Sequence, residues 1–543
     1  MHDTFPAGGT DRTQQHLWIV GGGIAGMAAA AFAIRDAHVP GENIHIIEEL
    51  GLPGGSMDAA ASPVAADAFV TRGGRMLEDK AYQCTWDLFE TIPSLEDPAV
   101  TVRQEILDFN VRVPTDARAR LIDADHRILD AADYGFSLRD RMDMSRLIAT
   151  PESLLGSRRI DEVFGEHFFA TNFWRCWRTT FAFQKWHSAV EMRRYCLRFL
   201  HVFETLASLS DVRRTVYNQY DSMIVPLQRW LVEQGVDVRF ATRVTDLDVV
   251  DDGAAGRRVT GLHLQTGQGD QQGTQHLPLG ENDYALVTLG SITADARYGT
   301  NDTVPELVRD HRDDSWKLWQ TLATKAGDFG RPIAFCGNVD EHKWESFTLT
   351  MHGDTLLKRI IDYSGNEPGT GALMTWINSG WHLSIVVPHQ PHFPGMPADT
   401  YTLWGYGFEI DRVGDHVRKP MTQATGQEIL TELVRQLGFD DILDEVLATT
   451  TVTTVMLPYA SALFACRAPG DRPKVVPDRS RNFAFLGQFA ELPEDIVFTV
   501  EYSIHGAMHA IYTLLDVDRP IPPIYHGIFD PAAALSATKT LIG

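Results

Sequence analysis

Short apolar runs bounded by turn residues recur along the chain and predict the buried strands of an α/β fold. The first run covers residues 17–20 (LWIV), and similar runs follow at residues 43–47 (NIHII), 284–289 (YALVTL) and 482–486 (NFAFL). Directly after the first run, residues 27–36 (MAAAAFAIRD) are rich in alanine, which is a strong helix former. The pattern therefore predicts a strand, a turn and a helix near the start of the chain.

The remaining segments show less regular patterns. Residues 76–90 predict a helix, and residues 139–210 predict a mainly helical region with many aromatic side chains. That density fits an ordinary core and the lining of a long apolar pocket equally well. Residues 236–242 and 244–250 are typical of strands that precede a turn at 251–253, and residues 300–480 predict a mixed α/β region.

The turn after the first strand contains a G-x-G-x-x-G motif formed by Gly21, Gly23 and Gly26. In a dinucleotide site the first glycine permits the tight turn, the second lets the backbone approach a pyrophosphate, and the third lets helix and strand pack closely. Glu48 ends the next predicted strand, 22 residues after Gly26, where a carboxylate can bind a ribose hydroxyl. Glu49 is the alternative ligand. A glycine-rich turn without a ligand is the competing interpretation, which the flanking strand and helix disfavour.

Two further glycine turns carry candidate cofactor contacts. Gly55 and Ser56 belong to the first turn, where N–H groups and a hydroxyl could bind ribose or phosphate. The second turn suggests backbone packed against a flat ligand with cations near its phosphates, and it consists of Arg72, Gly73, Gly74 and Arg75. Taken alone, the second turn could equally be a surface turn with solvated arginines.

Composition narrows the class of protein. The 543 residues suffice for two or three domains, and the formal net charge of −24 argues against a nucleic-acid partner. The five cysteines are scattered without a C-x-x-C pair, so neither a disulfide framework nor a zinc site is indicated. The first 16 residues lack an apolar stretch, and no run of about 18 apolar residues occurs. We therefore expect a cytoplasmic protein.

Longer motifs resemble one family, the oleate hydratases, also known as myosin-cross-reactive antigens. The matching stretches lie between about residues 17 and 510 and include GGGIAGMAAAAFAIRD, PGENIHIIEEL, GGSMD, RGGR, WDLFETIPSLEDP, FAFQKWHSAVEMRRY, YNQYDSM, QPHF, LWGYGF and GQFAELPEDIVFTVEYS. The resemblance implies a hydratase that adds water to the cis-9 double bond of oleic acid, giving 10-hydroxystearic acid. It also implies bound FAD, best in its reduced form, although the net reaction is not a redox reaction.

The resemblance implies two catalytic positions. The family's proposed water-activating glutamate directly follows R-G-G-R, where this chain has Met76. A thioether is only a weak hydrogen-bond acceptor and cannot act as a general base. In a helix over residues 76–90, Glu78 would point away from Met76 and Asp79 would lie nearer, so neither is a clean substitute.

The family's proposed proton donor ends E-x-R-R-Y and corresponds to Tyr195. Without the resemblance, a core tyrosine would be the favoured interpretation.

The resemblance also implies a binding site for the fatty-acid carboxylate, formed by Gln219 of Y-N-Q-Y with Tyr217 beside it and by His392 of P-H-F. The family's threonine and asparagine in the second motif are replaced by Val386 and Pro388. Half of the polar residues expected to bind the carboxylate are therefore missing, and other residues, His389 among them, could supply those contacts.

The fold class implied is α/β, with a Rossmann-like FAD-binding domain of the two-dinucleotide-binding flavoprotein type, a mixed α/β substrate domain and a helical, aromatic-rich insertion. The expected division is a discontinuous FAD-binding domain (16–80, 236–300 and 480–515), a mainly helical substrate-pocket region (81–235), a mixed α/β substrate domain (301–479) and a C-terminal tail (516–543). By the same carry-over, the candidate FAD contacts are Gly21, Gly23, Gly26, Glu48, Gly55, Ser56, Arg72, Gly73, Gly74, Arg75, Phe489, Thr499 and Ser503, with Gly290 and Ser291 as weaker candidates.

Two alternatives to a hydratase stay open. One is a flavin-dependent isomerase or oxidoreductase on the same fold, and the other is a fatty-acid-binding flavoprotein with little catalysis. Met76 and the two missing polar residues are the features that keep the second alternative open. The expected partner is an unsaturated long-chain free fatty acid, with at most transient membrane contact, and the expected state is a monomer or a homodimer.

Overall fold

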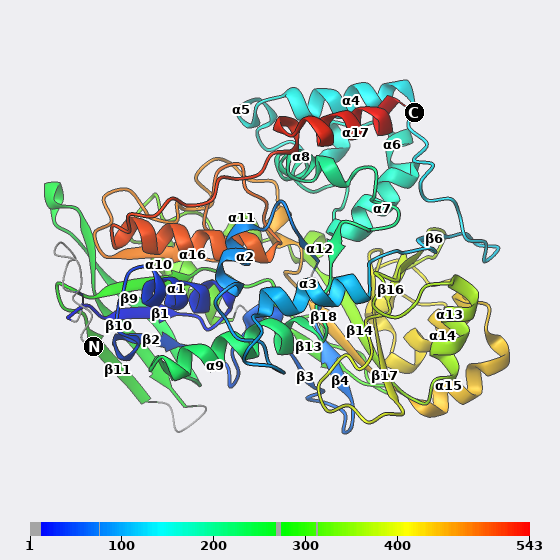
Figure 1. Cartoon of the computed structure of the whole chain (residues 1–543), viewed down its shortest axis with the longest axis horizontal. Helices are drawn as coiled ribbons and strands as arrows, with labels where there is room; N and C mark the ends of the chain where they lie inside the picture. Colours follow the sequence, from blue (N-terminus) through cyan, green and yellow to red (C-terminus); the bar gives the residue numbers. More distant parts are fainter. Residues whose placement is uncertain (1–11, 13, 75, 268–272, 311–312, 543) are drawn as a thin grey trace.

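The computed structural model describes residues 12, 14–74, 76–267, 273–310 and 313–542 (Figure 1). A five-stranded sheet lies at its centre, with all neighbouring strands parallel. Its order is β19 (Phe483–Leu486), β12 (Tyr284–Thr288), β1 (Leu17–Val20), β2 (Ile44–Ile47) and β8 (Asp237–Arg239). The four apolar runs thus meet in one parallel sheet, as expected for strands buried on both faces. The predicted α/β fold with a Rossmann-like core is confirmed.

Helix α1 (Ile24–Arg35) packs against both α16 (Val500–Leu514) and α9 (Val225–Glu233). Every residue of α1 from Ile24 to Ala33 is buried, because its small alanine side chains allow close packing. Helix α16 also contacts β19 and α2 (Gln83–Phe89), so the C-terminal part of the chain returns to the sheet that the N-terminal part begins (Figure 1).

A three-stranded antiparallel sheet extends from this core at the left of Figure 1. It consists of β9 (Thr242–Asp251), β10 (Arg257–Thr266) and β11 (Gly273–Pro278), and α10 (Asp314–Ala323) packs against β9. The predicted strands at 236–242 and 244–250 correspond to β8 and β9.

A seven-stranded mixed sheet forms the second large layer. Its order is β13 (Arg297–Gly299), β18 (Thr450–Leu457), β14 (Trp344–His352), β17 (Thr400–Gly407), β16 (Leu383–Val386), β15 (Leu373–Trp376) and β6 (Leu121–Ile122). A second core joins it to α13 (Thr355–Ser364), α14 (Gly426–Gln436) and α15 (Leu443–Thr449). Strand β6 comes from the segment expected to be mainly helical, and the division into domains stays a prediction.

The aromatic-rich segment forms a cluster of helices at the top of Figure 1, and α17 (Pro531–Ile542) lies beside them. They are α4 (Leu138–Ala149), α5 (Glu152–Leu155), α6 (Glu166–Ala170), α7 (Asn172–Phe181) and α8 (Ala189–Arg198). Thr171 caps α7 by accepting a hydrogen bond from the backbone of Trp174 at 3.1 Å. Within the cluster, the rings of Phe173 and Trp177 stack with centroids 5.4 Å apart. No helix in the described ranges combines the length and apolar character needed to cross a membrane.

The helix predicted over residues 76–90 is partly wrong. Residues Leu77–Glu78 form strand β5, which pairs with β7 (Val212–Arg213), and helix α2 begins only at Gln83. The Glu78 carboxylate also accepts a hydrogen bond from the backbone N–H of Ala81 at 2.5 Å, which holds a turn ahead of the helix. The helical direction inferred for Glu78 therefore does not apply.

Candidate functional site

A deep cleft opens at the carboxyl ends of the parallel strands, where ligands bind in open α/β sheets. Its volume is about 620 Å³, against about 120 Å³ and 50 Å³ for two further cavities, so it alone of the three has room for a dinucleotide. Ten of the candidate cofactor residues line it: Gly21, Gly23, Glu48, Gly55, Ser56, Arg72, Gly290, Ser291, Phe489 and Ser503.

The glycine motif has the backbone geometry that a pyrophosphate needs. Gly21 has φ of 101°, in the left-handed region that favours glycine. A Cβ atom at Gly26 would lie 2.1 Å from the Gly21 carbonyl oxygen, so no side chain fits between helix and turn. Helix α1 begins at Ile24, and its unpaired N–H groups face the cleft side. Gly26 itself packs beneath the cleft and does not line it.

Glu48 lies at the end of β2, as the motif predicts, and it is buried. Its carboxylate accepts hydrogen bonds from the backbone N–H groups of Gly22 at 2.6 Å and Leu50 at 2.8 Å. Burial raises its pKa, and these hydrogen bonds only partly offset that rise. Glu49 also lines the cleft and pairs with Arg243 at 2.9 Å, so the choice of ribose ligand stays a prediction.

Arg72 marks the boundary between the cleft and the second cavity, because it lines both. Its Nε donates to Asp58 at 2.8 Å, which fixes the guanidinium in place. Gly73, Gly74 and Thr499 line the second cavity and not the cleft. Arg75 lies outside the described residues.

The second cavity is mainly apolar and brings both predicted catalytic positions together. Met76 and Tyr195 line it, although they lie on a loop before β5 and on α8. Its aromatic wall includes Phe181, Phe199, Trp344, Trp404, Tyr406 and Phe498. The aromatic-rich helices therefore both pack as a core and line a pocket, which were the two interpretations left open.

Tyr195 is almost fully buried, and its hydroxyl donates to the backbone carbonyl of Val497 at 2.6 Å. Burial is the main cause that raises its pKa well above the ordinary value, and the neighbouring groups Tyr82, Glu191 and Asp495 add to it. The phenol consequently keeps its proton at neutral pH.

Glu78 is a carboxylate on the wall of the same cavity as Met76 and Tyr195. One of its oxygens lies 2.9 Å from His201 Nε2. Burial acts to raise the pKa of Glu78, but the contact with His201 and the backbone N–H groups outweigh it and hold the pKa below the usual range. Glu78 is therefore ionised at neutral pH. The helix predicted over residues 76–90 turns Glu78 away from Met76, whereas Leu77–Glu78 forms a strand.

The third cavity adjoins the second, since Gly74, Arg214, Val386 and Trp404 line both. It gathers the candidate carboxylate ligands Tyr217, Gln219 and His392 together with Pro388 and His389. Asn218 joins the two motifs, because its backbone and side-chain N–H groups both donate to the His392 carbonyl at 3.0 Å.

The three candidate carboxylate ligands differ in availability. The side-chain nitrogen of Gln219 is buried and has no hydrogen-bond partner among the described residues. Burial lowers the pKa of His392 to about 3, so its imidazole is neutral. The hydroxyl of Tyr217 donates to Glu96 at 3.0 Å and is already engaged.

Comparison with known proteins agrees with the motifs. A family model described as the MCRA family matches residues 14–512. An oleate hydratase from Streptococcus pyogenes serotype M49 (strain NZ131) is 38% identical over 535 residues, covering 96% of this chain and 89% of the relative. A linoleate hydratase from Lactiplantibacillus plantarum is 34% identical over 561 residues, covering 96% of this chain and 98% of the relative.

Among solved structures, cyclohexylamine oxidase from Brevibacterium oxydans IH-35A matches with a TM-score of 0.49 at 12% identity, covering 92% of this chain and 98% of that one. This weak likeness adds nothing to the fold, which the sheet topology establishes. The family match spans nearly the whole chain. The chain belongs to the MCRA family.

Proposed function

We propose that this protein is an FAD-dependent fatty acid hydratase that adds water to the cis-9 double bond of oleic acid and gives 10-hydroxystearic acid. Its relatives named oleate hydratase and linoleate hydratase support this proposal. The observation that carries it is the second cavity, where a protonated tyrosine and an ionised carboxylate share an apolar chamber. That chamber lies between a dinucleotide cleft and a pocket with polar donors.

Hydration of an unactivated alkene needs a proton placed on one carbon as water attacks the other. Tyr195 supplies the proton after its hydroxyl rotates about the C–O bond, away from Val497 and toward the cavity. The attacking water gives its proton to Glu78, which replaces the family's glutamate at Met76 as the base. A proton then returns from Glu78 to Tyr195, and no electrons are exchanged. Positioned proton transfer of this kind typically contributes about 10² to 10⁴ in rate.

The residues of the cleft fit FAD. The glycine turn leaves no room for a side chain at Gly26 and frees backbone N–H groups for a pyrophosphate, and Glu48 or Glu49 would bind the ribose. Phe489 and Gly290 both line the cleft and approach each other closely, and a flat ring could pack beside them. When bound, FAD supplies a polar ring system that helps to shape the reaction site, best in its reduced form.

We also infer a cytoplasmic monomer or homodimer that takes free fatty acid with at most transient membrane contact. The net charge of −24 disfavours a lasting electrostatic association with anionic lipid, which supports this inference. Light scattering of the purified protein, with and without anionic vesicles, tests both the oligomeric state and the membrane contact.

Mass spectrometry of the product from oleic acid, FAD and H₂¹⁸O tests the proposed function. A hydroxylated product that carries ¹⁸O, formed without stoichiometric flavin oxidation, is the expected result. A product changed by two mass units would instead indicate an oxidoreductase, and a product of unchanged mass but shifted double bond would indicate an isomerase. Unchanged oleate that nevertheless binds would favour the weakly catalytic binding protein.

A further inference from the structure

The junction between the second and third cavities contains a cation for which the motifs give no role. We propose that Arg214 binds the carboxylate of the fatty acid. It would replace the polar contacts of the family's threonine and asparagine, whose positions are Val386 and Pro388 here. This inference rests on the proposed function, because it identifies how the same substrate is held. Arg214 lines both cavities, and so does Val386.

The main chain of Arg214 is fixed independently of its side chain. Asn110, on helix α3 (Val102–Arg112), accepts a hydrogen bond from the Arg214 N–H at 3.0 Å and donates one to its carbonyl at 2.8 Å. A substitution at this position therefore leaves the backbone clamp intact, so that the guanidinium can be tested by itself.

The guanidinium of Arg214 has no ion pair or side-chain hydrogen bond within the described ranges, and its Nε is buried without a partner. Burial lowers its pKa to about 10, so it stays charged at neutral pH. Arg120 lies close enough to contribute to this shift, and among the described residues its guanidinium donates only to the Leu373 carbonyl at 3.1 Å and Thr180 at 2.9 Å. A buried charge without a counter-ion is costly, so this region is suited to an anion from outside.

Apart from Arg120, whose guanidinium bonds a carbonyl and a hydroxyl, the buried arginines of the described ranges have carboxylate partners. Arg194 pairs with Glu152 at 2.8 Å, and Arg472 pairs with Glu191 at 2.9 Å. The sequence has 72 acidic residues against 48 basic ones, so acidic partners are plentiful. The lack of a described acidic partner at Arg214 is consequently a local property of the cavity wall.

Donors for a carboxylate converge from the neighbouring wall. A Cβ atom at Gly371, which lines the third cavity, would lie 3.7 Å from Arg214 Nη2, so this end of the guanidinium lies at that wall. The unpartnered side-chain nitrogen of Gln219 and the neutral imidazole of His392 line the same cavity. A carboxylate has two acceptor oxygens and pairs well with the planar fork of arginine. Binding there places the acyl chain toward Tyr195 in the second cavity.

The test compares oleate with methyl oleate, which has no carboxylate charge, in wild-type protein, Arg214→Met and Arg214→Lys. We expect Arg214→Met to raise the Kd and KM for oleate about 10- to 100-fold while changing those for methyl oleate little. The Kd and KM of Arg214→Lys for oleate should lie between those of wild-type protein and Arg214→Met, because lysine keeps the charge and lacks the planar guanidinium. The melting temperature of Arg214→Met should stay unchanged or rise, since an unpaired buried charge is removed.

Arg213→Gln is the matched control, because Arg213 is the neighbouring arginine and pairs with Asp79 at 2.7 Å. It should keep the wild-type preference for acid over ester. If Arg214→Met also keeps that preference, with FAD content and melting temperature intact, Arg214 does not bind the carboxylate. Failure of the proposed function would look different: wild-type protein would form no hydroxylated product, while equilibrium binding of oleate would still test Arg214.

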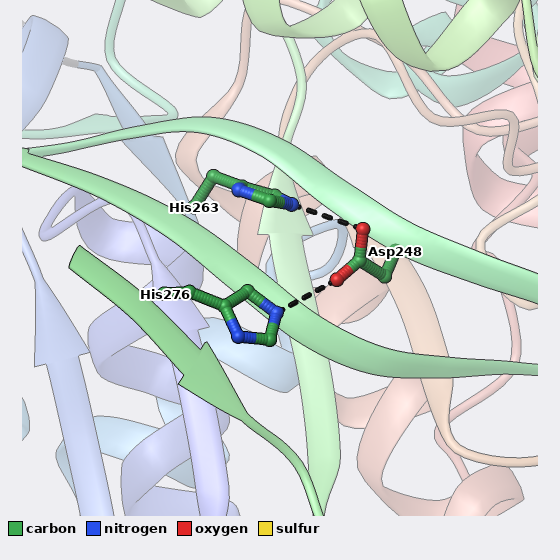
Figure 2. Close-up of side chains that lie close together, drawn as sticks. All are labelled: Asp248, His263 and His276. Atoms are coloured by element: carbon green, nitrogen blue, oxygen red, sulfur yellow. Dashed lines mark hydrogen bonds and ion pairs between the residues drawn. The ribbon is translucent and has the colours of Figure 1, made fainter. Parts of the chain in front are cut away.

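A second, independent observation concerns the antiparallel sheet. His263 and His276 lie directly opposite each other on β10 and β11, and both point toward Asp248 of β9 (Figure 2). The Nε2 atoms lie 2.9 Å and 2.8 Å from the two carboxylate oxygens. We propose that this cluster binds a divalent transition-metal ion and thereby joins the outer strand to the rest of the sheet.

The positions of the three side chains suit a metal ion that keeps further coordination positions open to solvent. Neighbouring ligand atoms of an octahedral ion with bonds of about 2.1 Å are about 3 Å apart, close to the observed separations. The space for the cluster depends on Gly261, because a Cβ atom there would lie 2.4 Å from His276 Nε2 and 2.7 Å from an Asp248 oxygen. All three side chains are 41–50% exposed, so an ion can reach them from solvent. The imidazole tautomer that carries its proton on Nδ1 presents the Nε2 lone pair to that ion.

Titration calorimetry with ZnCl₂ and NiCl₂ on chelator-treated holoprotein tests this site. We expect one equivalent to bind, a loss of at least about 10-fold in affinity in His276→Gln and in His263→Gln, and no change in His352→Gln, an exposed histidine outside the cluster. The metal should also raise the melting temperature of wild-type protein and not that of His276→Gln. Equal affinities in wild-type protein and His276→Gln, or no binding at all, would overturn the proposal.

Discussion

The dinucleotide cleft and the adjoining cavities are built in different ways. The cleft owes its form to backbone: a left-handed glycine, a helix N-terminus and a helix packed against a turn with no space for a Cβ atom. The second and third cavities owe theirs to side chains that come from separate parts of the chain, among them Glu78, Tyr195 and Arg214. A substitution that adds side-chain atoms at the glycine turn should therefore weaken FAD binding in the cleft. A substitution that changes a functional group and keeps the side-chain shape should instead reduce turnover or substrate binding in the cavities.

Tyr195→Phe should have the largest effect, because it removes the proposed acid and keeps the ring. We expect kcat to fall about 10²- to 10⁴-fold while FAD content stays at the wild-type level. Product formation and the flavin absorbance of the purified variant measure the two effects. A variant with normal turnover would remove Tyr195 from the reaction and weaken the contrast between cavity and cleft.

Glu78→Gln should come next, with kcat reduced about 10²-fold, because the amide keeps the shape of the side chain and cannot accept a proton from water. Asp79→Asn is the matched control, since Asp79 is the neighbouring acidic residue, pairs with Arg213 and does not line the cavity. Steady-state kinetics of both variants check this prediction. Equal activities in the two variants would leave the base unassigned.

Gly26→Ala tests the cleft. Its Cβ atom would lie 2.1 Å from the Gly21 carbonyl oxygen, so helix α1 must shift, and overpacking of this kind costs about 1 to 3 kcal/mol. We expect a lower melting temperature and weaker FAD retention. Gly327→Ala is the control, because a Cβ atom there meets nothing within 4 Å. Normal FAD retention in Gly26→Ala would show that the cleft tolerates added atoms.

The smallest expected effect is on how the stability of the fold depends on pH. Because the pKa of Glu78 is lower in the folded protein than the unfolded value of about 4.3, its carboxylate stabilises the fold at neutral pH. That contribution is lost as the pH falls through the unfolded value toward the lower folded one. Melting temperatures of wild-type protein and Glu78→Gln should therefore differ more at pH 7 than at pH 4. A difference that is independent of pH would contradict the assigned charge.

The contrast between the cleft and the cavities also explains which parts of the site could be predicted from the sequence. The motif of Gly21, Gly23 and Gly26 acts through contiguous backbone, so its spacing alone locates the cleft, and the apolar runs locate the strands around it. The position of Glu78 could not be predicted, because β5 forms only by pairing with β7 far along the chain. Arg214 carries no local pattern either: only the folded chain reveals that it faces a cavity and has no described acidic partner.

The most direct test is a crystal structure of the FAD-bound protein with 10-hydroxystearic acid. We expect the C10 hydroxyl group in the second cavity, within hydrogen-bond reach of Tyr195 or Glu78, and the carboxylate at Arg214 and Gln219 in the third. An acid bound in the opposite direction, or with its hydroxyl group away from the second cavity, would contradict the proposed division of roles among the three cavities.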